Sequence, residues 1–205
     1  MATKPDAPPA PEQHRNRTEE AILSAARAEL IEGGFRDATV ELIARRAYVS
    51  RTSFYFYFPN KRAVMDRLIR QVFAEMYEAA GPYVEGDGDP RADLHAALAG
   101  VVVVVDREAD VLRLALDLAG AEDQLPSEWQ PYIHLFVRSA TERIERDQRR
   151  GLAPDDIGAA ISARALCAMV ERHVAVELIL GEGDAHASVA ALAELWYRAA
   201  YSGAS

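Results

Sequence analysis

The chain has 205 residues and a net charge of −9 at pH 7, and half of its residues are hydrophobic, which is enough apolar material for a buried core. Its single cysteine, Cys167, excludes an intrachain disulfide and fits a reducing compartment, so we expect a cytoplasmic protein. The sequence has no run of about 18 apolar residues, and we therefore expect no membrane span.

The chain is predicted to begin with an arm and a helix. Residues 1–15 are rich in Pro, Ala and charged residues and lack the apolar core of a signal peptide, which predicts a flexible arm. Asn16, followed three residues later by Glu19, predicts the start of a helix whose apolar face continues to Gly33 and Gly34. We expect this helix to brace the segment that follows.

Residues 39–61 predict two short helices joined by a tight turn. Thr39 can cap the first helix, because apolar residues then recur at helical spacing as far as Ala47. Ser50 can cap a second helix that begins at Arg51, since its hydroxyl can accept a hydrogen bond from a backbone N–H two or three residues later. After Pro59 and Asn60, a third helix is predicted to start at Lys61 and to run toward Gly81.

The second short helix has the composition of a helix that reads DNA. Its first turns would present Arg51, Thr52, Ser53 and Tyr55 to base edges, while two phenylalanines pack inward. Tyr57 and Lys61 lie further along and suit phosphate oxygens, which position a protein on DNA without specifying sequence. The predicted DNA-binding residues are Thr39, Ser50, Arg51, Thr52, Ser53, Tyr55, Tyr57 and Lys61.

The same residues carry a family resemblance. Read in order, Thr39-Val40, Ile43-Ala44, Ala47, Val49-Ser50 and the run from Phe54 to Lys61 resemble the helix-turn-helix signature of the TetR family of bacterial transcriptional regulators. The run SRTSFYFYFPNK is especially similar to the mycobacterial repressors of Baeyer-Villiger-type monooxygenases that activate thioamide prodrugs.

The resemblance implies an all-α fold with two domains, and we expect no cofactor. Residues 16–64 would form an N-terminal three-helix helix-turn-helix domain, and residues 65–205 a helical ligand-binding and dimerisation domain. It further implies a homodimer that grips a palindromic operator in double-stranded DNA until a small hydrophobic effector releases it. In this family the last two helices pair with their copies in a four-helix interface.

One residue departs from the family pattern. The turn between the two short helices usually carries glycine, which adopts a positive φ without strain, whereas this chain has Tyr48 there. We expect either a slightly different turn or a phosphate contact from Tyr48 itself.

The charge distribution agrees with a DNA-binding end. Residues 1–70 carry 12 Lys and Arg against 9 Asp and Glu, whereas residues 71–205 carry 11 against 23. The basic surplus therefore lies where the motif lies, as expected when one end of a protein meets phosphate.

Beyond the motif, the pattern predicts further helices. Asp89 followed by Pro90 predicts a helix start, and the five valines 101–105 are interpreted as part of a buried helix, because the segments on both sides are helical and no partner strand is apparent. Ser127 or a neighbour would open a helix that carries Trp129. The run ERIERDQRR at its far end is interpreted as a solvated helix end.

An apolar cavity for the effector is predicted among these later helices. Trp129, Ile133 and Phe136 share one helical face, and residues of the last two helices can converge on it. The alternative for each aromatic residue is plain core packing, and for Arg113 and Glu171 it is a salt bridge or a solvent-facing position. The predicted ligand-binding residues are Arg113, Trp129, Ile133, Phe136, Val170, Glu171, Val174 and Trp196.

Metal and catalytic sites are not predicted. The five histidines lack metal-ligand spacing, and the chain has no G-x-S-x-G, P-loop or G-x-G-x-x-G motif. The second hypothesis for function is an all-helical enzyme or carrier for an apolar small molecule that only borrows the DNA-binding motif.

Overall fold

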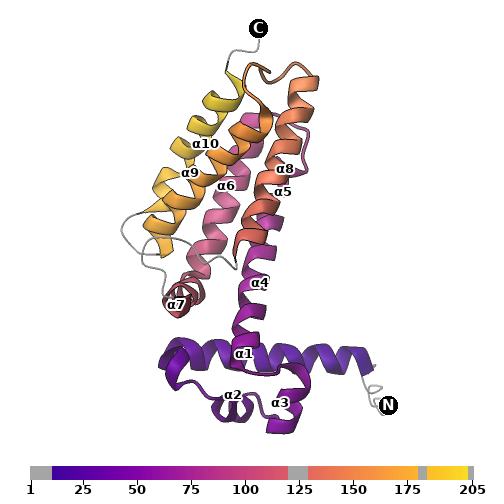
Figure 1. The fold of residues 1–205 in the computed structure, drawn as a ribbon, viewed down its shortest axis with the longest axis vertical. Coiled ribbons are helices and arrows are strands. Elements are labelled where there is room, and N and C mark those ends of the chain that lie inside the picture. The colour runs from indigo at the N-terminus through magenta and orange to yellow at the C-terminus, as the bar shows by residue number, and fades with distance from the viewer. Residues whose placement is uncertain (1–10, 120–128, 180–183, 203–205) are drawn as a thin grey trace, which may run out of the picture. The chain divides into compact units, whose positions relative to one another are not determined.

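The computed structural model describes residues 11–119, 129–179 and 184–202, and within these ranges every regular element is a helix (Figure 1). The predicted all-α fold is confirmed. The chain divides into two compact units, Met1–Ile69 and Arg70–Ser205, and the division falls inside helix α4 (Lys61–Ala79). None of the described helices is both long and apolar enough to cross a bilayer.

The first unit begins with a longer helix than the sequence predicted. Helix α1 spans Pro11–Asp37, so Asn16 lies inside the helix and the prediction that it caps the start was wrong. Residues 11–15 of the predicted arm are helical, while residues 1–10 lie outside the described residues. The helix is interrupted where predicted, because Gly34 has a φ of 72° that breaks the regular geometry.

Two short helices follow, and their starts agree with the capping prediction. The Thr39 side chain accepts a hydrogen bond from the Leu42 N–H at the start of α2 (Val40–Arg46), and the Ser50 side chain accepts one from the Ser53 N–H at the start of α3 (Arg51–Tyr57). Each cap satisfies a backbone donor that has no partner within its helix.

The core of the first unit lies between these helices. Its wholly buried side chains come from all four of them, so α2 and α3 are held by packing as well as by their caps. These side chains are Ile22, Ala26, Leu30, Ile43, Phe54 and Val64.

The second unit is a bundle of helices built from the end of α4 onward. In Figure 1, α10 runs alongside α6 and α8 alongside α9, and these are the most extensive helix pairs in the unit. Its elements are α5 (Gly81–Val84), α6 (Pro90–Arg107), α7 (Ala109–Ala119), α8 (Gln130–Arg149), α9 (Ala159–Val174), the π-helical turn η2 (Ala175–Ile179) and α10 (Ala185–Tyr201).

The valine run lies in a helix, as predicted. Asp89 caps α6 by accepting a hydrogen bond from the Ala92 N–H, and Pro90 occupies the first turn. Val101, Val102, Val104 and Val105 are buried in this helix, while Val103 is exposed. Burial on most of its circumference explains why an amphipathic pattern is hard to see in this part of the sequence.

One face of the charged end of α8 is buried, so the interpretation of ERIERDQRR as a solvated helix end was wrong for Arg143 and Asp147, while Glu142 and Arg149 are exposed. The side chains of Arg143 and Asp147 are fully buried, and the Arg143 Nε donates to the Asp147 carboxylate at 2.6 Å. Arg143 also donates to the carbonyls of Tyr83 and Gly86, each at 2.8 Å, and to the carboxylate of Asp93 at 3.1 Å. The guanidinium thus fixes the connection between α5 and α6.

Asp147 also ends a directed chain of hydrogen bonds from α10. The Tyr201 hydroxyl donates to Asp147 at 3.0 Å, so its oxygen accepts from the Tyr83 hydroxyl, which lies 2.9 Å away. The Trp196 indole N–H in turn donates to the Tyr83 oxygen at 3.3 Å. Burial raises the pKa of Tyr83 to about 12, so the Tyr83 hydroxyl stays protonated at neutral pH and can donate to Tyr201.

Replacing Arg143 by Met is predicted to destabilise the second unit strongly. The change leaves Asp147 buried without its main cationic partner, which costs about 3–5 kcal/mol of unfolding free energy. Urea denaturation of Arg143→Met measures this cost. The control is Arg149→Met, an exposed arginine of the same helix, for which a change within about 0.5 kcal/mol is expected. Equal effects for the two variants would contradict the structural role given to Arg143.

Candidate functional site

Helix α3 presents a polar and aromatic face to solvent. Arg51, Thr52 and Tyr55 are exposed, while Phe54 and Phe58 are buried as predicted. The predicted contact residues Thr39 and Ser50 are exposed, and Ser53 and Tyr57 are partly exposed. The short helix therefore uses its phenylalanines to hold its position in the core and leaves its first turns available for a partner.

The turn before α3 has the strained geometry that the sequence implied. Tyr48 adopts a φ of 56°, the only positive φ of a non-glycine residue within the described ranges. A bulky side chain in this region costs free energy that glycine would not cost. Tyr48 is 97% exposed, so packing of its side chain does not offset the backbone strain in the isolated chain.

Phe56 is a surface residue of α3 that the sequence reasoning missed. Its ring is 71% exposed, and the Arg15 guanidinium lies 5.9 Å from the ring centroid. The sequence could have indicated this exposure. Phe54 and Phe58 are four residues apart and share the buried face of the helix, so Phe56, two residues from each, points to a different face.

An arginine of α2 ties that helix to α1. The Arg46 guanidinium donates to the Glu32 carboxylate at 2.6 and 2.8 Å and to Glu29 at 3.0 Å. Hydrogen bonds to Glu32 and Glu29 raise the pKa of Arg46, so it stays charged. Arg46 is therefore engaged within the protein, whereas Arg51 heads α3 with its side chain in solvent.

The structure gives Lys61 a role other than the predicted phosphate contact. Its ammonium donates to the carbonyl oxygens of Phe35, Arg36 and Ala38, the last at 2.8 Å. It also lies 4.5 Å from the centroid of the Phe35 ring. Three carbonyls and an aromatic face satisfy the ammonium internally, so Lys61 fixes the start of α4 to the end of α1.

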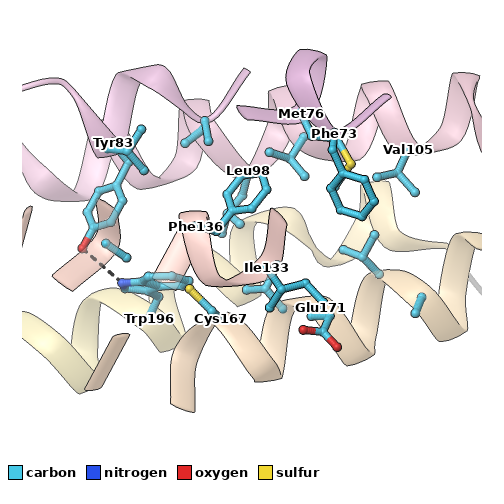
Figure 2. Close-up of a pocket in the computed structure, with 18 of the residues that line it drawn as sticks. Phe73, Met76, Tyr83, Leu98, Val105, Ile133, Phe136, Cys167, Glu171 and Trp196 are labelled. Atoms are coloured by element: carbon cyan, nitrogen blue, oxygen red, sulfur yellow. Dashed lines mark hydrogen bonds between the residues drawn. The ribbon is translucent and has the colours of Figure 1, made fainter. Parts of the chain in front are cut away.

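The second unit contains a cavity of about 140 Å³ (Figure 2). This is on the order of the engineered protein cavity that binds benzene. Side chains from each helix between α4 and α10, and from η2, line it, and almost all of the accessible wall is apolar. The Tyr83 hydroxyl and the Trp196 indole N–H are hydrogen-bonded to each other, so neither offers a free group to a ligand.

Most of the predicted ligand-binding residues lie around this cavity. The structure brings together Trp129, Ile133, Phe136, Val170, Glu171, Val174 and Trp196. Arg113 does not line it. Its Nε donates to the Ile179 carbonyl at 2.5 Å, and its guanidinium lies 3.5 Å from the Asp110 carboxylate, so its placement in the ligand site was wrong.

The sequence reasoning missed the part of the wall formed by α4, α5 and α6. Phe73 and Met76 of α4 line the cavity together with Leu98 and Val105 of α6, and Figure 2 draws all four on the side opposite Cys167 and Glu171. Their apolar spacing is that of any buried helix face, and nothing in the sequence separates a cavity wall from a filled core. Ser127, the predicted helix start, lies outside the described residues, and Trp129 directly precedes α8.

Two ionisable groups of the wall have shifted pKa values. Burial, together with the nearby charge of Glu171, raises the pKa of the Cys167 thiol to about 12, so this cysteine stays neutral and unreactive at physiological pH. Burial raises the pKa of the Glu171 carboxyl. Among the described residues, no group of three potential metal ligands occurs.

These features define a class of protein: a helix-turn-helix DNA-binding unit followed by a helical domain that encloses an apolar cavity. Two family models match. The model described as bacterial regulatory proteins, tetR family, matches residues 22–68, and the model of the C-terminal domain of the transcriptional regulator EthR matches residues 94–202. The chain therefore belongs to the TetR family of bacterial transcriptional regulators, with a C-terminal domain of the EthR type.

Individual relatives agree with this assignment. The HTH-type transcriptional regulator EthR of Mycolicibacterium smegmatis is 26% identical over 186 residues, which cover 89% of this chain and 86% of that protein. SmeT, the repressor of the Stenotrophomonas maltophilia multidrug efflux pump SmeDEF, has the same fold, with a TM-score of 0.73 at 19% identity over 92% of this chain and 95% of SmeT. Its complex with triclosan superposes with a TM-score of 0.72 at 21% identity, over 92% and 94% of the two chains.

The family assignment decides between the two functional hypotheses. Both family models describe transcriptional regulators, and their matches extend over the DNA-binding motif and most of the second unit. The chain is therefore a regulator of transcription and not an enzyme.

Replacing Lys61 by Met tests whether this residue serves the fold or contacts phosphate. The variant keeps the apolar stem but leaves three carbonyls without their donor, so we expect a loss of about 1–3 kcal/mol in unfolding free energy. The slope of log affinity for DNA against log salt should stay unchanged. A slope reduced by about one, with stability unaffected, would restore the phosphate contact.

Proposed function

We propose that the chain is a ligand-responsive transcriptional repressor that binds a palindromic operator as a homodimer and is released by a small apolar effector. The observation that carries the proposal is the presence, in one chain, of a solvent-facing helix α3 and an apolar cavity whose wall includes the second half of α4. Helix α4 begins directly after α3, so displacement of α4 by a ligand is a direct route to the DNA-binding unit.

The proposed DNA contacts follow from the exposed groups of α3. Arg51 suits a bidentate contact to guanine, and the Thr52 methyl suits the thymine methyl. Tyr55 and the exposed ring of Tyr48 are further candidates, for bases and phosphate respectively. A contact to DNA would give the strained turn at Tyr48 a functional reason.

The proposed dimer uses the outer surface of α9 and α10. Ile161 on α9 and Leu195 on α10 are exposed large apolar side chains, with 68% and 54% of their surface accessible in the single chain. Apolar residues exposed on neighbouring helices are typical of a surface that a partner covers. A two-fold dimer would present two copies of α3 to major grooves about one helical turn, roughly 34 Å, apart.

The proposed effector is small and mostly apolar. The SmeT–triclosan complex shows that a protein of this fold holds a compact aromatic compound. In the present chain, the aromatic side chains of Phe73, Trp129, Phe136 and Trp196 supply apolar surface for such a molecule. The hydrogen-bonded Tyr83 and Trp196 offer few partners for additional polar atoms, which favours ligands with a small polar part.

Replacing Arg51 by Ala is predicted to remove sequence-specific DNA binding. A bidentate contact to guanine contributes about 1–3 kcal/mol of discrimination, so the preference for an operator selected from random DNA should fall by roughly 5- to 150-fold. Fluorescence anisotropy at fixed salt measures the preference over competitor DNA. Arg70→Ala, an exposed arginine outside the helix-turn-helix, is the matched control. Undiminished operator preference in Arg51→Ala would refute the assignment of α3 as the reading helix.

Ligand binding in the cavity is predicted to change the intrinsic fluorescence of the protein. Trp129 and Trp196 are the only tryptophans in the sequence, and both are buried in the cavity wall. Titration with propylbenzene should therefore shift or quench their emission. Val170→Phe fills part of the space and should weaken binding at least tenfold, whereas Val103→Phe, at an exposed site, should not. Equal binding by the two variants would locate the ligand elsewhere.

A further inference from the structure

Among the described residues that line the cavity, Glu171 is the only acidic or basic side chain. The lining is otherwise formed by aliphatic and aromatic residues and by Cys167, whose thiol is neutral. Figure 2 shows the Glu171 carboxylate on α9 at the edge of the group of lining side chains, beside Ile133. The stem of Glu171 thus contributes to the wall, and its charged end lies at the margin of the cavity.

This carboxylate lacks a partner within the described residues. Neither a hydrogen bond nor a salt bridge engages it there, and burial is the only cause that raises its pKa. The contrast with Asp147 is informative, because that carboxylate accepts hydrogen bonds from two arginines and a tyrosine. A half-buried carboxylate without a partner destabilises the free protein, and a ligand that supplies a donor removes the penalty.

The surroundings disfavour an anionic ligand. Arg113, the arginine predicted to face the cavity, donates to the Ile179 carbonyl and lies beside Asp110. Arg143 is committed to Asp147 and to the connection between α5 and α6. The described part of the lining includes no lysine or arginine, and residues 71–205 carry 23 acidic against 11 basic residues. The potential of this unit therefore attracts cations and repels carboxylates.

We propose that the effector is an amphiphilic amine, with an apolar body in the cavity and an ammonium group that donates to the Glu171 carboxylate. This inference rests on the proposed function, since it specifies the chemical class of a ligand for the same cavity. The cavity volume of about 140 Å³ fits a body of about one aromatic ring. A charge-assisted hydrogen bond at the margin would then select the amine over neutral and acidic analogues of the same shape.

Three probes with the same apolar body test the inference: 3-phenylpropylamine, 3-phenylpropan-1-ol and 3-phenylpropanoate. Each is titrated into the full chain at pH 7.5, and the emission of Trp129 and Trp196 reports binding. The amine is expected to bind about 10- to 100-fold more tightly than the alcohol, and the carboxylate more weakly than either.

Glu171→Gln assigns the preference to this side chain. The variant should bind the amine no more tightly than the alcohol, while its affinity for the alcohol stays within about twofold of the unchanged protein. Glu142→Gln removes the same charge from an exposed position on α8 and should retain the full preference. Lowering the pH through the raised pKa of Glu171 protonates the carboxylate, so affinity for the amine should fall while that for the alcohol does not.

The outcomes separate this inference from the proposed function. Equal affinity for amine and alcohol, or an amine preference that persists in Glu171→Gln, overturns the role assigned to Glu171. Either result still supports the cavity as a site for apolar ligands. If none of the three probes binds, the cavity is not a site for compact apolar ligands, and the proposed function and this inference both fail.

Discussion

The buried ion pair between Arg143 and Asp147 is the interaction on which the second unit depends. A fully buried guanidinium is tolerated only because carboxylates and backbone carbonyls neutralise and solvate it. These partners come from α5, from the connection that follows it and from α8, and Tyr201 brings α10 into the same network. Tyr83 and Trp196, whose rings line the cavity, are oriented by the same hydrogen bonds. The network that stabilises the bundle therefore also shapes one end of the ligand site.

The first unit is held by different means. Its small core of apolar side chains is supplemented by helix caps at Thr39 and Ser50 and by Arg46, which bridges α2 to α1. Phe54 and Phe58 hold α3 by one face, and the opposite face is largely exposed in the isolated chain, where Phe56 lies beside Arg15. The exposed aromatic rings and the positive φ of Tyr48 lower the folding stability of the free protein. Such features are expected at a surface built for a partner, and a nucleic acid provides both stacking and hydrogen-bond acceptors for them.

The sequence predicted local structure well where the determinants are local. Caps at Thr39, Ser50 and Asp89 depend on a side chain and a backbone group three residues away, and each forms as predicted. Interactions with long-range partners were not predicted. The sequence did not reveal the internal hydrogen bonds of Lys61 or the burial of Arg143, because the carbonyls that accept from these side chains are 23 or more residues away in sequence. Similarly, the contribution of α4 and α6 to the cavity follows from tertiary packing and leaves no distinct pattern in the sequence.

We propose that a ligand bound in the cavity weakens the binding of helix α3 to DNA. The most direct test measures operator affinity by anisotropy with increasing propylbenzene, in the unchanged protein and in Val170→Phe. Coupling of about 1–3 kcal/mol predicts roughly 5- to 150-fold weaker DNA binding at saturating ligand, and little or no effect in the variant with the filled cavity. If operator affinity stays constant while the ligand saturates the tryptophan signal, the cavity does not control DNA binding.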